Sequence, residues 1–247
     1  PAFTDEKDIY RGGRGMRKLC GRAAVTMVAV ALVVAAGTAW AAPVIQGSLV
    51  LDRIGATYSG SGGEFNIEPV SGPALGYLSA NPPALNADSF QSFCLERGEL
   101  VSPGSTYDYV INTGAVNGGG GAVGNFDPLD PKTAYLYTEF SQGTLAGYDY
   151  AEGTGRQASA DALQKAIWYI EQELASLPTG LATDFYNAAV GAGWSDIGNV
   201  RVLNLYASGG TAVKQDQLVM IPTPAAVFMG LPLLGLLGAL RVVRRRA

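Results

Sequence analysis

Two residues far apart in the sequence have side chains that could react with one another. Cys94 lies in the segment Phe-Gln-Ser-Phe-Cys-Leu-Glu, and Gln164 lies in Leu-Gln-Lys-Ala-Ile-Trp. Attack of the cysteine thiolate on the glutamine side-chain carbonyl would expel ammonia and leave a Cys–Gln thioester. Such a bond persists only where water is excluded, and Phe90, Phe93 and Trp168 are apolar side chains that could shield it. Once exposed to an amine, the thioester would acylate it, attaching the protein covalently without a catalytic triad.

Cys94 calls for an explanation because it is the one cysteine expected in the mature chain. The sequence has two cysteines, and Cys20 falls within a predicted signal peptide. A lone cysteine in an exported protein cannot form an internal disulfide. Three roles therefore stay open for Cys94: a small buried hydrophobe, a partner in an intermolecular disulfide, or a reactive group. Gln164 could likewise be a core residue whose amide hydrogen-bonds a strand backbone.

The elements that must position this pair are predicted to be strands on either side of three helices. Alternation and β-branched residues predict strands over residues 43–53, 64–70, 88–96, 106–112, 200–206 and 217–221. Helical spacing predicts helices over residues 132–141, 158–175 and 181–190. Residues 117–124 are glycine-rich and predict a loop. The predicted fold class is therefore α+β: a β-rich sandwich or barrel-like body with a central helical insertion, plus a C-terminal transmembrane helix.

Local end signals set the expected helix boundaries. Asp130 is expected to cap the first helix, with Pro131 at its first position. Ser159 or Asp161 is expected to cap the second helix, and Pro178 to end it. Gln164 then falls at the edge of an apolar stripe, one turn before Trp168, so its amide is expected to face partly inward.

The N-terminal region predicts export. Residues 17–22 are basic, residues 23–36 are uncharged, and Ala39-Trp40-Ala41 supplies the small residues that a signal peptidase reads. We expect residues 16–41 to be a signal peptide for the Sec pathway, with Met16 as the biological start. Residues 1–15 are expected to be upstream, non-native sequence. Residues 42–217 are expected to form an extracytoplasmic domain.

The C-terminal region predicts a membrane segment. Residues 218–240 carry no charge, and a helix over 225–243 would rise about 28 Å, close to the thickness of a bilayer core. Arg244, Arg245 and Arg246 follow and place that end on the cytoplasmic side. Pro222 and Pro224 mark a stiff, non-helical entry.

The order Pro222-Thr223-Pro224, apolar run and arginine tail in residues 218–247 resembles the PEP-CTERM sorting signal of exported Gram-negative proteins. Thr223 stands where that signal usually has Glu. The resemblance implies an exosortase as processing partner, transient anchoring in the inner membrane, and a final location at the cell surface or outside the cell. A permanent tail anchor is the alternative.

A second resemblance concerns the body of the chain. The aromatic-Cys context of Cys94 and the later Gln-x-Ala-Ile-Trp at Gln164 look like the thioester domains of bacterial surface adhesins, which implies that these two residues form the bond. Residues 90–173 also resemble a group of uncharacterised PEP-CTERM proteins, through Phe-Cys-Leu-Glu, Asp-Pro-Leu-Asp-Pro-Lys-Thr-Ala-Tyr-Leu-Tyr and Ala-Leu-Gln-Lys-Ala-Ile-Trp-Tyr-Ile-Glu.

Composition narrows the function classes. The sequence has no histidine, which excludes Ser-His and Cys-His nucleophiles and histidine-bound metals. Residues 43–220 hold 18 Asp and Glu against 7 Lys and Arg, a balance that disfavours nucleic-acid binding. Asp127 and Asp130, with Asp149 and Glu152 later, could ligate calcium. Their spacing is not that of an EF-hand loop, so turn or cap roles are preferred, and no metal or cofactor is expected.

These observations leave several functions open. The main prediction is a structural or adhesive surface protein, associated with exopolysaccharide or joined covalently to amine-bearing surface molecules. The alternatives are a tail-anchored envelope protein with a non-covalent binding domain and a carboxylate-dependent hydrolase.

Overall fold

The computed structural model describes residues 42–54, 62–76 and 88–222. Its strands are β1 (Gly47–Arg53), β2 (Phe65–Pro69), β3 (Phe90–Ser92), β4 (Ser105–Asn112), β5 (Gly114–Val116), β6 (Phe126–Pro128), β7 (Val200–Ala207) and β8 (Val213–Met220). Its helices are the 3-10 turn η1 (Pro73–Gly76), α2 (Pro131–Gln142), α3 (Thr154–Ile170) and α4 (Leu181–Ala192).

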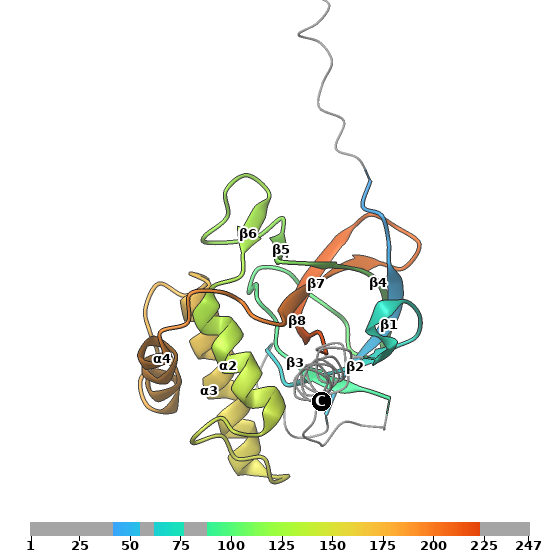
Figure 1. The fold of residues 1–247 in the computed structure, drawn as a ribbon. Coiled ribbons are helices and arrows are strands. Elements are labelled where there is room, and N and C mark those ends of the chain that lie inside the picture. Colours follow the sequence, from blue (N-terminus) through green and yellow to red (C-terminus); the bar gives the residue numbers. More distant parts are fainter. Residues whose placement is uncertain (1–41, 55–61, 77–87, 223–247) are drawn as a thin grey trace, which may run out of the picture. The chain divides into compact units, whose positions relative to one another are not determined.

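Six strands form one antiparallel sheet in the order β3-β2-β1-β4-β7-β8. The chain leaving β3 runs beside β8 at the other edge: Leu218 N donates to Phe93 O at 3.0 Å, and Leu95 N donates to Asp216 O at 3.1 Å. These bonds bring the two edges together and curl the sheet into a half-barrel (Figure 1). The fold is mixed α and β, and it follows the barrel-like alternative of the sequence prediction.

The three α-helices form the insertion between β6 and β7, and they gather on one side of the curled sheet (Figure 1). In α3, Leu163, Ala166 and Ile167 pack into the core shared with α2 and α4. Trp168 packs instead into the core of the curled sheet. Because α3 is buried on both of these faces, the polar side chain of Gln164 lies in the interior of the protein.

The ends of α2 follow the sequence signals. Asp130 accepts a hydrogen bond from Lys132 N at 2.8 Å as the N-cap, and Pro131 occupies the first turn. Gly143 closes the helix with φ of 73°, a left-handed conformation that glycine adopts at little cost. The predicted cap and first helical position are confirmed.

The ends of α3 differ from the prediction. The helix begins at Thr154 after Gly153, with no side-chain cap, so the expected capping by Ser159 or Asp161 is wrong. Ser159 lies inside the helix, where its hydroxyl donates to Gly155 O. The helix ends at Ile170, well before Pro178, because Gln172 turns into the left-handed region with φ of 63°.

Two strand predictions also change. The glycine-rich loop is framed by the hairpin β5-β6, which the sequence analysis did not predict. β8 begins at Val213 and continues to Met220, so the first residues of region 218–247 belong to the sheet.

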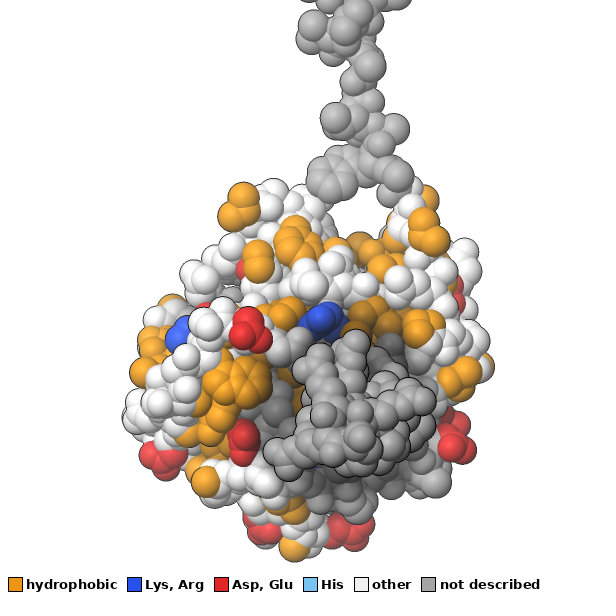
Figure 2. Space-filling view, viewed as in Figure 1, with side chains coloured by type: hydrophobic (Ala, Val, Ile, Leu, Met, Phe, Trp, Pro, Cys, Tyr) orange, Lys and Arg blue, Asp and Glu red, His pale blue; other side chains and the backbone are white. Residues whose placement is uncertain are grey.

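The described residues include no helix that is both long and apolar enough to span a membrane. The predicted span 225–243 lies outside them, as do residues 1–15 and the predicted signal peptide 16–41. On the face of the body shown in Figure 2, Asp and Glu side chains are scattered singly and Lys and Arg are few.

Candidate functional site

The structure brings Cys94 and Gln164 together in the interior. Cys94 follows β3 in the segment that runs beside β8, and it forms an isolated bridge with Gln217. Gln164 comes from the middle of α3. The exposed fractions of the two residues are 0% and 1%. The pair therefore lies where the helical insertion meets the seam of the curled sheet.

The side-chain amide of Gln164 is held by backbone groups at both of its polar atoms. Its Oε1 accepts from Gly63 N at 3.0 Å and from Cys94 N at 3.2 Å. Its Nε2 donates to Cys94 O at 2.7 Å. The thiol of Cys94 approaches the same oxygen, with Sγ 3.3 Å from Oε1. The amide is thus fixed in one orientation against the sulfur.

Two backbone N–H groups on one carbonyl oxygen form the arrangement that stabilises negative charge on that oxygen during acyl transfer. Here the donors are Gly63 N and Cys94 N, and the oxygen belongs to Gln164. Attack by sulfur would place charge on this atom. The two N–H groups therefore make Cδ of Gln164 more electrophilic, with the sulfur of Cys94 beside it.

The glycine pair before β2, Gly62 and Gly63, allows the backbone to come close to the side chain of Gln164. A Cβ on Gly62 would lie 2.5 Å from Gln164 Cγ and 3.1 Å from an atom of the Trp168 ring. A Cβ on Gly63 would lie 2.9 Å from Ser92 O. Sequence reasoning missed these residues, although a glycine pair directly before a strand is a signal of close backbone approach.

The Cys94 thiol is neutral in this environment. Burial raises its pKa far above the usual range, and the charge of Glu96 raises it further. The backbone N–H groups of Cys94 and Gly63 and the indole of Trp168 act in the opposite direction but do not offset burial. A reaction of this thiol would therefore depend on the polarised carbonyl and on proximity, whereas the sequence alone suggested a thiolate as the nucleophile.

The three predicted shielding residues are all buried. Phe90 and Trp168 belong to the same apolar cluster as Cys94, with exposed fractions of 2% and 7%. Phe93 belongs to the neighbouring helix-side cluster, where its ring meets Phe140 edge-on at 4.9 Å. Of the sorting residues, Pro222 is described and exposed, whereas Thr223, Pro224, Arg244, Arg245 and Arg246 lie outside the described residues.

A carboxyl cluster that sequence reasoning also missed lies two residues beyond Cys94. Burial, with charge from Asp216 and Glu99, raises the pKa of Glu96 to about 10. Burial also raises the pKa of Asp216, even though Val116 N donates to it at 2.7 Å and Asn204 Nδ2 at 2.9 Å. In the described part of the chain, no three Cys, Asp or Glu side chains are arranged to hold a metal ion.

A surface hollow of about 490 Å³ lies at the end of α3. Its lining includes Lys132, Gln172 and the edge-to-face rings of Tyr169 and Tyr186, whose centroids are 5.2 Å apart. It contains neither member of the Cys94–Gln164 pair.

No family model and no curated protein matches this sequence. One solved structure, described as the N-terminal thioester domain of a surface protein from Clostridium perfringens, matches with a TM-score of 0.42 and 14% identity. The match covers 70% of this chain and 96% of that domain. We base the functional conclusion on the geometry of Cys94 and Gln164, not on this likeness.

Proposed function

We propose that this protein is an exported surface or matrix protein that joins covalently to an amine on a partner molecule through a Cys94–Gln164 thioester. The observation that carries the proposal is the amide of Gln164, held by Gly63 N and Cys94 N with Cys94 Sγ 3.3 Å from its oxygen. All of these groups are buried.

Bond formation follows from this geometry. The sulfur of Cys94 attacks Cδ of Gln164, and the Sγ–Cδ bond forms while the Cδ–Nε2 bond breaks. The thiol proton passes to Nε2, which leaves as ammonia. The two backbone N–H groups stabilise the charge that develops on Oε1. Because the sulfur and the amide are held within one site, no intermolecular encounter is needed.

Coupling to a partner is the reverse of the first step, with the partner's amine in place of ammonia. A primary amine attacks Cδ, the Sγ–Cδ bond breaks, and the sulfur regains a proton from the amine. The product is an amide between the partner and the side chain of residue 164. The protein reacts once and is not regenerated, so we class it as a single-turnover acyl donor, not as an enzyme.

The termini complete the proposal. Export by the signal peptide 16–41 would bring the body to a compartment where amine-bearing surface molecules or a polysaccharide matrix are present. Processing at residues 218–247 by an exosortase would release or display it. The mass of the mature protein from its host reports both cleavages directly.

Intact-mass measurement of the exported protein tests the thioester. We expect a mass lower by one ammonia molecule, a Cys94 that resists alkylation even when the chain is unfolded with the reagent present, and a methylamine adduct that appears together with a free thiol. Cys94→Ala should abolish the ammonia loss and the adduct while leaving the fold intact. An unmodified mass, with a Cys94 thiol that is alkylated once the chain is unfolded, would contradict the proposal.

A further inference from the structure

A buried ion pair joins the start of α3 to the chain just before β2. Arg156 and Glu64 are both 0% exposed. Arg156 Nε donates to Glu64 Oε2 at 2.7 Å, and its second arm pairs with Glu64 Oε1. The remaining guanidinium nitrogen donates to Tyr150 O at 2.6 Å, and Tyr148 OH donates to Glu64 Oε2 at 3.0 Å. The guanidinium group of Arg156 is thus bound by Glu64 and by the backbone carbonyl of Tyr150.

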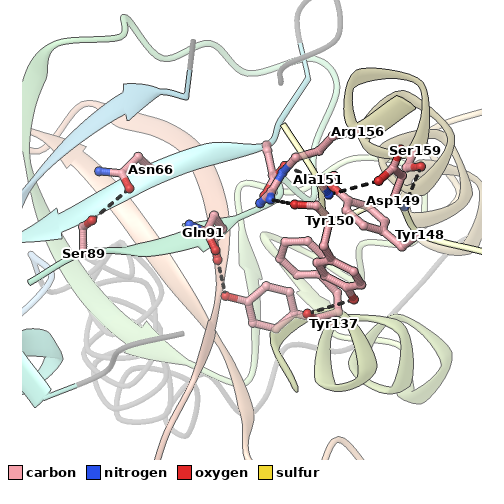
Figure 3. Close-up of polar contacts among 12 residues, drawn as sticks. Asn66, Ser89, Gln91, Tyr137, Tyr148, Asp149, Tyr150, Ala151, Arg156 and Ser159 are labelled. Carbon is pink, nitrogen blue, oxygen red and sulfur yellow. Dashed lines mark hydrogen bonds and ion pairs between the residues drawn. The ribbon is translucent and has the colours of Figure 1, made fainter. Parts of the chain in front are cut away.

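The turn that carries these tyrosines is itself braced against α3 (Figure 3). Asp149 N donates to the hydroxyl of Ser159 at 3.0 Å, and Ala151 N donates to Asp149 Oδ1 at 3.0 Å. Arg156 belongs to the same helix, about one turn before Ser159 (Figure 3). The ion pair is therefore part of a rigid network and not an isolated contact.

Stability alone does not explain this pair. Burial by itself would lower the pKa of Arg156, but the hydrogen bonds and charge of Glu64 outweigh it and raise that pKa. Removing two charges from water is costly, and replacing a buried ion pair with apolar residues of similar size is often neutral or stabilising. What the pair does provide is a fixed geometry, because it ties Glu64 and the turn at Tyr150 to one side chain of α3.

The geometry that it imposes reaches the candidate site. Glu64 directly follows Gly63, whose N–H binds Gln164 Oε1. Arg156 and Gln164 lie on one helix, eight residues and about 12 Å apart along its axis. The chain before β2 is therefore fastened to α3 at two points, one of which is the contact that polarises the reacting amide.

We propose that Glu64 and Arg156 form a positioning pair that holds Gly63 N in place to bind Gln164 Oε1 during thioester formation. The inference rests on the proposed function. Neither residue touches the reacting atoms, so the pair acts through the backbone. Without it, the bond from Gly63 N to Gln164 Oε1 would be the one remaining hydrogen bond between the described residues 62–64 and α3.

The test compares the removal of two different ion pairs that involve α3, one buried and one at the surface. In one variant, Glu64→Leu with Arg156→Met replaces the buried pair by apolar side chains. In the matched control, Asp161→Asn with Lys165→Gln removes the pair between Asp161 and Lys165, which lies at the surface of the same helix. Full-length chains are recovered in guanidinium chloride, their intact Gln164 is confirmed by mass, and they are refolded by dilution.

Samples quenched in acid at timed intervals then report the fraction of folded chains that has lost ammonia. We expect the apolar double variant to regain the wild-type near-ultraviolet circular dichroism but to lose ammonia about tenfold more slowly or worse, since one misplaced oxyanion donor has at least that effect. The control should react at the wild-type rate. Arg156→Lys, which keeps the charge but not the two-armed contact, should also be slow.

The outcomes separate the two proposals. A wild type that never loses ammonia overturns the proposed function and this inference with it. A reactive wild type, together with an apolar double variant or an Arg156→Lys variant that reacts equally fast, overturns the positioning role alone. Slow reaction in both variants with a native circular dichroism spectrum supports it.

Discussion

Two buried polar clusters lie side by side along the seam between the end of β3 and β8, and they are built in opposite ways. In the first, the amide of Gln164 is neutral and both of its polar atoms bind backbone groups. In the second, three carboxyl groups meet at Glu96, Glu99 and Asp216. The pKa values of Glu96 and Glu99 depend on one another, because their carboxyl groups also share a side-chain hydrogen bond.

The first cluster is arranged for a reaction between two neutral groups, whereas the second consists of groups that bind and release protons. Backbone donors hold Gln164 in one orientation, and a neutral thiol and a neutral amide do not change charge near neutral pH. Burial and mutual repulsion raise the pKa values of these carboxyl groups, so their charge depends on pH. We therefore expect the chemistry to follow the first cluster and the pH dependence of stability to follow the second.

The largest expected effect is on the free energy of unfolding, when the side-chain amide of Gln164 is removed. In a Cys94→Ala background, where no bond can form, Gln164→Leu leaves Gly63 N, Cys94 N and Cys94 O without partners. Each buried group left unpaired costs about 1 to 3 kcal/mol, so the free energy of unfolding should fall by about 3 kcal/mol or more. Urea denaturation measures this change.

The matched control is Gln91→Leu. Gln91 is also fully buried, but neither polar atom of its side chain has a hydrogen-bond partner within the described residues. Replacing an unpaired amide by an apolar group of similar size should be neutral or stabilising. Equal destabilisation by the two substitutions would show that backbone pairing does not distinguish Gln164.

A smaller effect is expected from Gly62→Ala. The new methyl group would press on Gln164 Cγ and the ring of Trp168, moving the amide away from its donors. Displacement of a reacting group by about 1 Å lowers rates by about a hundredfold, so ammonia loss during refolding should slow by about that factor. Mass spectrometry of timed samples measures the rate.

Gly98→Ala serves as the comparison, because a Cβ at Gly98 meets nothing within 4 Å. It should react like the wild type. If Gly62→Ala reacts equally fast, the close approach of the glycine pair has no part in the reaction.

The smallest expected effect is the change in the stability of the folded state with pH. Burial, with charge from Asp130 and Asp127, raises the pKa of Glu171 from 4.5 to about 8, although a hydrogen bond from Thr133 acts against it. The folded state therefore binds more protons than the unfolded chain between about pH 4.5 and about pH 8. Stability is greatest below this window and declines as pH rises through it, and Glu96 adds a decline that extends to about pH 10.

Calorimetry should show Tm falling by a few degrees across that window, with a shallower fall in Glu171→Gln. Glu152→Gln, at an exposed position, should keep the wild-type slope. The rate of ammonia loss should stay nearly constant over the same range. A rate that rises about tenfold for each pH unit would instead identify a thiolate as the attacking species.

Much of the fold could be predicted because its signals are local. Asp130 and Pro131 begin α2 as expected, and the helical spacing of Leu163, Ala166 and Ile167 correctly predicts a buried face of α3. The curled sheet was anticipated only as one of two alternatives. The start of α3 was misplaced because Gly153 lacks a capping side chain and Ser159 lies within the helix.

Composition and local pattern limit the chemistry that is possible: one cysteine in the body, no histidine, an acidic balance, and a glutamine on a helix that carries an apolar stripe. Which of these groups come into contact depends on long-range packing. Gly63 lies 101 residues from Gln164, Glu64 lies 92 residues from Arg156, and Glu96 lies 120 residues from Asp216. Periodicity and capping act within a few turns of chain, whereas these contacts form only when the sheet curls and packs its seam against α3.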